Sequence, residues 1–177
     1  LDMAVRLFQQ TSMRCRYSSI PVIAATQGYV IGGGVELLMH CDAAICAAES
    51  YIGLVEMGVG LLPGGGGTKE FTIRLSDELK ETDVQIPQLI QRFKTLATAA
   101  VATSGFEAFD LGYLNKTRDA ICIYNGFQIQ LAKQKVLSLA TNYIQPNQRR
   151  DIQVLGRSGL AALYAATNSM KLGGYAS

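Results

Sequence analysis

Two clusters of glycine residues, each between an apolar run and a helix-like segment, constrain this chain more than any other feature. The first cluster, residues 32–34, lies between the apolar run 20–26 and a helical pattern at residues 35–40. The second cluster, residues 64–67, follows the apolar run 42–48 and leads into another helical pattern. Short apolar runs of this kind are typical of strands buried on both faces. The alternation therefore predicts an α/β fold with parallel strands.

The remainder of the chain is mostly helical in pattern. Residues 51–60 are expected to be a loop or an extended stretch, residues 76–83 a surface connection, and residues 119–123 a last short strand. Helical patterns cover residues 2–16, 68–75, 88–98, 104–111, 128–143 and 151–171. A chain of 177 residues is long enough for one compact core, so a single domain is expected. We expect residues 1–100 to form the α/β core and residues 101–177 a helical region of the same domain or a capping or trimerisation subdomain.

Composition excludes several classes of function. The net charge is +2 and only 17% of residues are charged, so the chain lacks the basic field that nucleic-acid binding requires. No apolar run reaches eighteen residues, and no membrane span is expected. Four cysteines without CxxC spacing and a single histidine predict neither a zinc site nor a disulfide framework, which favours the cytoplasm. The chain begins without Met and with a helix already under way, so we expect a fragment with a missing upstream part.

The first glycine cluster has a chemical as well as a structural interpretation. The first N–H groups of a helix have no partner inside the helix, and glycines leave them unhindered. Together with the helix dipole, such groups can bind a carbonyl oxygen that becomes negative during a reaction, where one donor is worth about 10²–10³ in rate. The alternative is a tight turn that only allows the strand and the helix to pack closely.

Two acidic residues follow the predicted strands. Glu36 lies in the first turn of the helix after residues 32–34, where capping alone could account for a carboxylate. Glu56 is the only acid in an otherwise apolar stretch, where ionisation is costly without a partner or a task. Groups beyond the carboxyl ends of neighbouring parallel strands converge on one crevice. The sequence therefore predicts a pair of carboxylates that divide acid and base roles, next to an activated carbonyl.

Two motifs carry a family resemblance. Residues 20–37 read Ile-Pro-Val-Ile-Ala-Ala-Thr-Gln-Gly-Tyr-Val-Ile-Gly-Gly-Gly-Val-Glu-Leu, and residues 51–68 read Tyr-Ile-Gly-Leu-Val-Glu-Met-Gly-Val-Gly-Leu-Leu-Pro-Gly-Gly-Gly-Gly-Thr. In this order and at this spacing they resemble the two signatures of the crotonase (enoyl-CoA hydratase/isomerase) superfamily. The resemblance implies a ClpP/crotonase-like fold, a repeated ββα superhelix with a helical C-terminal region, of which the N-terminal part is missing here.

The resemblance also implies roles for particular residues. The N–H of Gly33 would donate to the thioester carbonyl, Glu36 would act chiefly as base toward a water, and Glu56 would exchange the proton of the α-carbon. The substrate-binding loops would include Gly32, Gly34, Pro63 and Gly64. Neither a metal nor a tightly bound cofactor is implied, since coenzyme A is part of the substrate. The second oxyanion donor of the family lies in an upstream loop that also helps bind adenine, and the sequence begins after that loop.

Having both acids favours hydration of a trans-2-enoyl-CoA to a 3-hydroxyacyl-CoA in fatty-acid β-oxidation, because relatives that lack one acid tend to be isomerases or other acyl-CoA enzymes. Residues 104–114 and 145–156 look like the hydratase part of bacterial proteins that also contain an NAD-dependent 3-hydroxyacyl-CoA dehydrogenase. The resemblance therefore implies an acyl-CoA substrate and either a fused dehydrogenase domain or a homo-oligomer, a trimer or a dimer of trimers.

Other interpretations of the same residues remain. A dinucleotide-binding turn would need GxGxxG, but Leu37 stands where its last glycine belongs. A Clp-type serine protease would need a serine at the turn, and the turn has none; His40 is then expected to be a packed core histidine. A crotonase-like module kept only for assembly is the non-enzymatic alternative. Scattered cations are candidates for the CoA phosphates, although such side chains usually face solvent: Lys116, Arg118, Lys133, Lys135 and Arg149.

Overall fold

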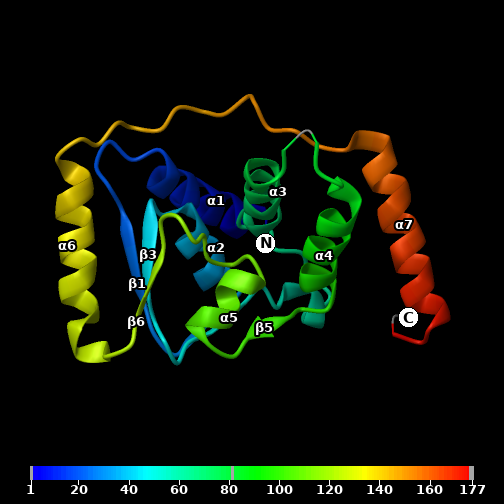
Figure 1. Ribbon diagram of the computed structural model, residues 1–177, viewed down its shortest axis with the longest axis horizontal. Coiled ribbons are helices and arrows are strands. Elements are labelled where there is room, and N and C mark those ends of the chain that lie inside the picture. Colours follow the sequence, from blue (N-terminus) through cyan, green and yellow to red (C-terminus); the bar gives the residue numbers. More distant parts are fainter. Residues whose placement is uncertain (1, 81, 176–177) are drawn as a thin grey trace.

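The computed structural model describes residues 2–80 and 82–175, and it shows a mixed α/β architecture with two three-stranded sheets (Figure 1). The strands are β1 (Ile23–Thr26), β2 (Tyr29–Ile31), β3 (Ala43–Ala47), β4 (Tyr51–Gly53), β5 (Val101–Ala102) and β6 (Ala120–Cys122). The helices are α1 (Asp2–Arg16), α2 (Gly33–His40), α3 (Gly67–Glu78), α4 (Gln85–Ala97), α5 (Gly105–Asp110), α6 (Gln128–Ala140) and α7 (Gly156–Leu172), with short 3₁₀ helices at Glu56–Val59 and Asn125–Phe127. None of the described helices has both the length and the apolar character that a bilayer span requires.

The chain repeats a ββα unit. The first unit is β1, β2 and α2, and the second is β3, β4 and α3. One sheet has the order β1-β3-β6 and the other β2-β4-β5, so each unit contributes one strand to each sheet. The pairs β1–β3, β3–β6 and β2–β4 are parallel, whereas β4–β5 is antiparallel. The predicted α/β fold with repeated ββα units and a helical C-terminal region is confirmed.

Several predicted boundaries were wrong. Strands β2, β4 and β5 were not predicted as strands, because two or three residues are too few to show a periodic pattern. Helix α2 begins at Gly33 rather than at residue 35, so two of the three glycines are helical. Helix α3 runs to Glu78, inside the stretch expected to be a surface connection, and helix α7 begins at Gly156 rather than at residue 151.

The core lies between the sheets and helices α2 and α3. All five residues of β3 are buried, as its uninterrupted apolar sequence predicts. Helix α2 adds Val35 and Met39, both fully buried. From α3, the ring of Phe71 packs edge-on against Tyr113, with the ring centroids 5.4 Å apart. This packing fixes the start of α2, from which the first candidate acid projects.

The C-terminal part extends along two sides of this core (Figure 1). Helix α6 contacts β1 and β3, and an extended connection then crosses the molecule to α7, which contacts α4. Strands β5 and β6 pair with β4 and β3, so the sheets include residues on both sides of position 100. The division into residues 1–100 and 101–177 stays a prediction.

Candidate active site

The start of helix α2 leaves three backbone donors free within the described residues. Gly32 is the N-cap, with φ 57°, a left-handed value that glycine adopts without strain. Its N–H donates to the carbonyl of Gly53 at 2.8 Å, which continues the pairing of β2 with β4. The N–H groups of Gly33, Gly34 and Val35, at the first three helical positions, donate to no carbonyl within residues 2–80 and 82–175. This helix start therefore has free donors, and the role of the Gly33 N–H toward a ligand stays a prediction.

The two acids emerge at the same end of neighbouring strands. Glu36 follows β2 through the first turn of α2, and Glu56 follows β4 as the first residue of a 3₁₀ helix. Because β2 and β4 are parallel partners, both acids lie beyond the carboxyl ends of adjacent strands. A Cβ atom on Gly32 would lie 3.1 Å from Oε1 of Glu56. Glycine at position 32 therefore lets the second carboxylate approach the turn.

One cavity of about 330 Å³ brings the candidate groups together. Both acids and Gly33 line it, next to the second glycine cluster and to side chains of α1. Its lining consists of Ala4, Val5, Phe8, Gly33, Glu36, Glu56, Leu62, Gly64 and Gly65. Of the other predicted loop residues, Gly34 and Pro63 do not line it, and Gly32 meets it through its approach to Glu56.

The Glu36 carboxyl group is buried but hydrogen-bonded. Its residue is 3% exposed, and the N–H of Gly67 donates to Oε1 at 2.8 Å. Burial raises the pKa of Glu36 above its usual value, and the charge of Glu56 raises it further. Backbone N–H groups of the second glycine cluster, first that of Gly67, act in the opposite direction. Glu36 is therefore a carboxyl group held in place by backbone donors, with an increased tendency to keep a proton.

Glu56 carries an unsatisfied oxygen. Its Oε2 atom is buried and has no hydrogen-bond partner in the described part of the chain. A buried carboxylate oxygen without a partner is costly, and such atoms usually bind water or a ligand. Within the described residues, this oxygen therefore lacks the hydrogen bond that a buried carboxylate needs.

Side chains from α1 complete the wall of the cavity, and the sequence did not single them out. A Cβ atom on Gly33 would lie 3.2 Å from the ring of Phe8, and one on Gly65 only 2.1 Å from that ring. Phe8 therefore packs across both glycine clusters. Its position in an amphipathic helical pattern predicts a buried face but not the partner of that face. The run of four glycines in the sequence, in contrast, does indicate a close approach at Gly65.

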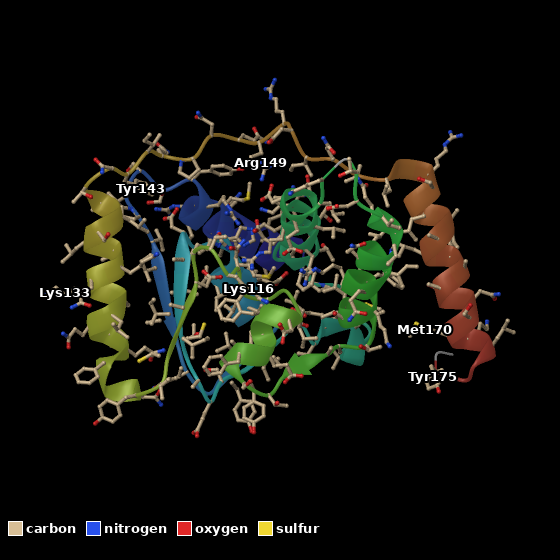
Figure 2. All side chains as sticks on the ribbon, viewed as in Figure 1. Lys116, Lys133, Tyr143, Arg149, Met170 and Tyr175 are labelled. Carbon is tan, nitrogen blue, oxygen red and sulfur yellow. The ribbon has the colours of Figure 1, made fainter. Side chains whose placement is uncertain are left out.

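The candidate cations do not form one patch. Lys116, Lys133 and Arg149 lie on three separate segments of the molecule (Figure 2). Arg149 pairs with Asp77 at 2.6 Å and with Asp151 at 2.9 Å. Within the described residues, no group of three His, Cys, Asp or Glu side chains is arranged to hold a metal ion. The chemistry available in the cavity is that of two carboxyl groups and a backbone donor.

Comparison with known proteins agrees with this geometry. Residues 4–91 match the family model described as enoyl-CoA hydratase/isomerase. Residues 4–91 belong to this family. The crotonase fold is shown as well, because the structure superposes on an enoyl-CoA hydratase from Geobacillus kaustophilus with a TM-score of 0.61, at 21% identity, over 78% of this chain and 46% of that one.

Two relatives illustrate the range of the family. The chain is 38% identical, over its whole length, to a protein from Bacillus subtilis named probable 3-hydroxyacyl-CoA dehydrogenase, of which it covers 22%. It is 37% identical over 98 residues to a crotonyl-CoA hydratase from Syntrophomonas wolfei, with 54% of this chain and 32% of that protein covered. The chain thus spans less than a third of each relative's length.

Proposed function

We propose that this chain carries the acid–base pair of an enoyl-CoA hydratase, which adds water to a trans-2-enoyl-CoA to give a 3-hydroxyacyl-CoA. One observation carries the proposal: Glu36, Glu56 and Gly33 line the same cavity, and the N–H of Gly33 has no carbonyl partner in the described chain. The chemistry requires a base for water, an acid for the α-carbon and a donor for the thioester oxygen. The cavity contains one group for each task.

The proposed reaction proceeds in two linked proton transfers. Glu36 takes a proton from the water while the water oxygen bonds to the β-carbon, and the electron pair moves onto the thioester oxygen. The N–H of Gly33 stabilises that negative oxygen. The enolate then takes a proton at the α-carbon from Glu56, which restores the carbonyl. The sum of these steps adds one water across the double bond.

The surroundings of Glu36 contain both opposing and supporting influences on its role as base. Burial and the charge of Glu56 raise the pKa of Glu36, whereas backbone N–H groups of the second glycine cluster lower it. A base toward water must be ionised. The N–H of Gly67, which donates to Oε1 of Glu36 at 2.8 Å, stabilises this ionised form and supports the proposed role.

The name of the Bacillus subtilis relative supports a wider role within the same proposal. That protein is named as a 3-hydroxyacyl-CoA dehydrogenase, and hydration produces the substrate class of such an enzyme. We therefore place the chain in a multifunctional β-oxidation protein. NADH formation from crotonyl-CoA by the full-length protein, without added dehydrogenase, tests this wider role; formation of 3-hydroxybutyryl-CoA without NADH would contradict it.

A hydration assay on the full-length protein tests the catalytic proposal. With crotonyl-CoA as substrate, the absorbance of the enoyl thioester falls as water adds. Glu36→Gln and Glu56→Gln should each lower kcat by about 10²–10⁴, since each removes one acid–base group. Glu49→Gln is the matched control, because Glu49 is an exposed acid between β3 and β4.

The outcomes separate the alternatives. Variants within a few-fold of the parent would show that the assigned roles are wrong. A parent that moves the double bond of a 3-enoyl-CoA but adds no water would indicate an isomerase that uses the same acids. A parent inactive with both substrates would favour a crotonase-like assembly module.

A further inference from the structure

His40 lies behind the candidate active site, at the end of helix α2, and it is only 1% exposed. The prediction of a packed core histidine is confirmed. The ring, however, makes directed polar contacts as well as apolar ones. Its Nδ1 atom lies 2.6 Å from the carbonyl oxygen of Glu36, and its Nε2 atom lies 2.8 Å from Nζ of Lys69.

These two contacts fix the tautomer of His40. A carbonyl oxygen only accepts, so Nδ1 carries the hydrogen and donates to the Glu36 carbonyl. An ammonium group only donates, so Nε2 accepts from Lys69. Burial lowers the pKa of His40, with Lys69 and Arg16 acting in the same direction and the Glu36 carbonyl and Glu70 opposing them. The neutral ring is therefore the form that the contacts require.

The charged groups around His40 belong to helices α1 and α3. Glu70 is 1% exposed, and its Oε1 lies 3.5 Å from Nε2 of His40 and 3.2 Å from Nζ of Lys69. Arg16 pairs with the other oxygen of Glu70. The carboxylate of Glu70 is thus engaged by two cations, which leaves the histidine to act as a neutral donor.

The same ring supports the second glycine cluster. A Cβ atom on Gly66 would lie 2.6 Å from Cε1 of His40, so the ring packs directly against this backbone. The next residue, Gly67, donates its N–H to the Glu36 carboxylate. Gly64 and Gly65 line both the cavity that contains Glu36 and a second cavity of about 330 Å³ that contains His40. Backbone without side chains is therefore all that separates His40 from the candidate active site at these positions.

We propose that His40 is a positioning residue for Glu36, which holds both the backbone of Glu36 and the glycine cluster that binds its carboxylate. The inference rests on the proposed hydratase function. Loss of the ring would loosen the hydrogen bond between Gly67 N–H and the carboxylate. Because that hydrogen bond lowers the pKa of Glu36, loosening it should raise this pKa further.

A pair of substitutions tests this role. His40→Leu keeps much of the volume and removes both nitrogens, while His40→Asn keeps an amide N–H near the position of Nδ1. In the full-length protein, His40→Leu should lower kcat about tenfold with KM within about twofold, since misplacement of a catalytic group acts on the chemical step. The acidic limb of its pH–rate profile should move to higher pH. His40→Asn should recover most of the rate and the parental profile.

A second measurement does not depend on activity. The infrared band of the protonated Glu36 carboxyl group, assigned by its loss in Glu36→Gln, reports the pKa of this group without a ligand. A higher pKa in His40→Leu and a parental one in His40→Asn are expected. If the leucine variant does not fold, His40→Gln replaces it. The glutamine amide reaches the position of Nε2 and cannot donate to the Glu36 carbonyl as Nδ1 does.

Two results would overturn the inference. A folded His40→Leu protein with parental kcat and parental Glu36 pKa would show that the histidine only fills space. If His40→Asn lowers kcat as much as His40→Leu does, the hydrogen bond to the Glu36 carbonyl is not what positions Glu36. An inactive parent would count against the hydratase proposal alone, since the infrared titration still decides the role of His40.

Discussion

The two glycine clusters use the same backbone chemistry for different purposes. Each precedes a helix, where N–H groups lack partners within the helix. At the first cluster, Gly33 lines the cavity, and its N–H has no carbonyl partner in the described chain. At the second cluster, the N–H of Gly67 is bound to the Glu36 carboxylate. An N–H group at a helix start can thus either stay free to bind the substrate or bind a catalytic side chain and hold it in place.

The clusters also differ in how strictly they require glycine. A Cβ atom on Gly33 would meet only the end of the Phe8 ring, at 3.2 Å. One on Gly65 would lie 2.1 Å from that ring and 2.4 Å from Oε2 of Glu36. Gly33 is therefore constrained mainly by its chemistry, and Gly65 mainly by close packing around the carboxylate.

The largest expected effect is at the second cluster. Gly65→Ala would push the Phe8 ring and the Glu36 carboxylate apart, so we expect kcat for hydration to fall by about 10². Overpacking should also lower the free energy of unfolding by about 1–3 kcal/mol. Urea unfolding and the crotonyl-CoA assay measure the two effects.

Gly64→Ala is the matched control for stability at the second cluster. A Cβ atom at position 64 would have its nearest neighbours at an ordinary contact distance of 3.7 Å. Its free energy of unfolding should stay close to that of the parent. Equal losses of stability at positions 64 and 65 would mean that close packing is not what distinguishes Gly65.

A smaller effect is expected at the first cluster. Gly33→Ala keeps the N–H but places a methyl group beside it, against a ring that can move, so we expect kcat/KM to fall about tenfold through crowding of the oxyanion site. Gly34→Ala is the comparison, because its Cβ would meet only Val30 at 3.8 Å. In a helix this change should raise the free energy of unfolding by about 0.5–1 kcal/mol. Equal losses of kcat/KM at both positions would contradict the special place of Gly33.

The sequence predicted much of this arrangement because its signals are local. The glycine clusters lie next to the helices that they start, and Glu36 and Glu56 follow strands that lie side by side. The strands that carry these acids, β2 and β4, were not recognised, since three residues do not establish a period. The convergence of the acids was nevertheless predicted correctly, because the longer strands β1 and β3 pair in the same parallel order.

Contacts between distant segments could not be predicted from the sequence. Nothing in the pattern of α1 indicates that Phe8 packs against Gly33 and Gly65, because amphipathicity identifies a buried face without naming its partner. The same holds for His40, whose packing was predicted but whose contact with Lys69 depends on the meeting of α2 and α3. Residues that act through a neighbour leave no motif of their own.

The smallest expected effect concerns the stability of the buried carboxyl group. The folded protein raises the pKa of Glu36 above the usual 4.5, so the folded state holds this proton more tightly than the unfolded state does. Its contribution to stability is present below pH 4.5 and is lost as pH rises through the folded pKa. Glutamine does not ionise, so Glu36→Gln does not lose stability in this way as the pH rises. Between pH 4.5 and the folded pKa of Glu36, the free energy of unfolding of the variant should therefore increase relative to that of the parent. The increase should be about 1.4 kcal/mol for each unit by which folding raises the pKa of Glu36.

Urea unfolding at pH 4 and pH 8 measures this difference, with Glu49→Gln as the control at an exposed acid. A gain for Glu36→Gln at pH 8 that disappears at pH 4 means that burial and the charge of Glu56 outweigh the backbone donors. A loss at pH 8 would mean that the N–H groups of the second glycine cluster stabilise the carboxylate more than burial destabilises it. In that case the second cluster would hold Glu36 as an anion, the form that a base toward water requires.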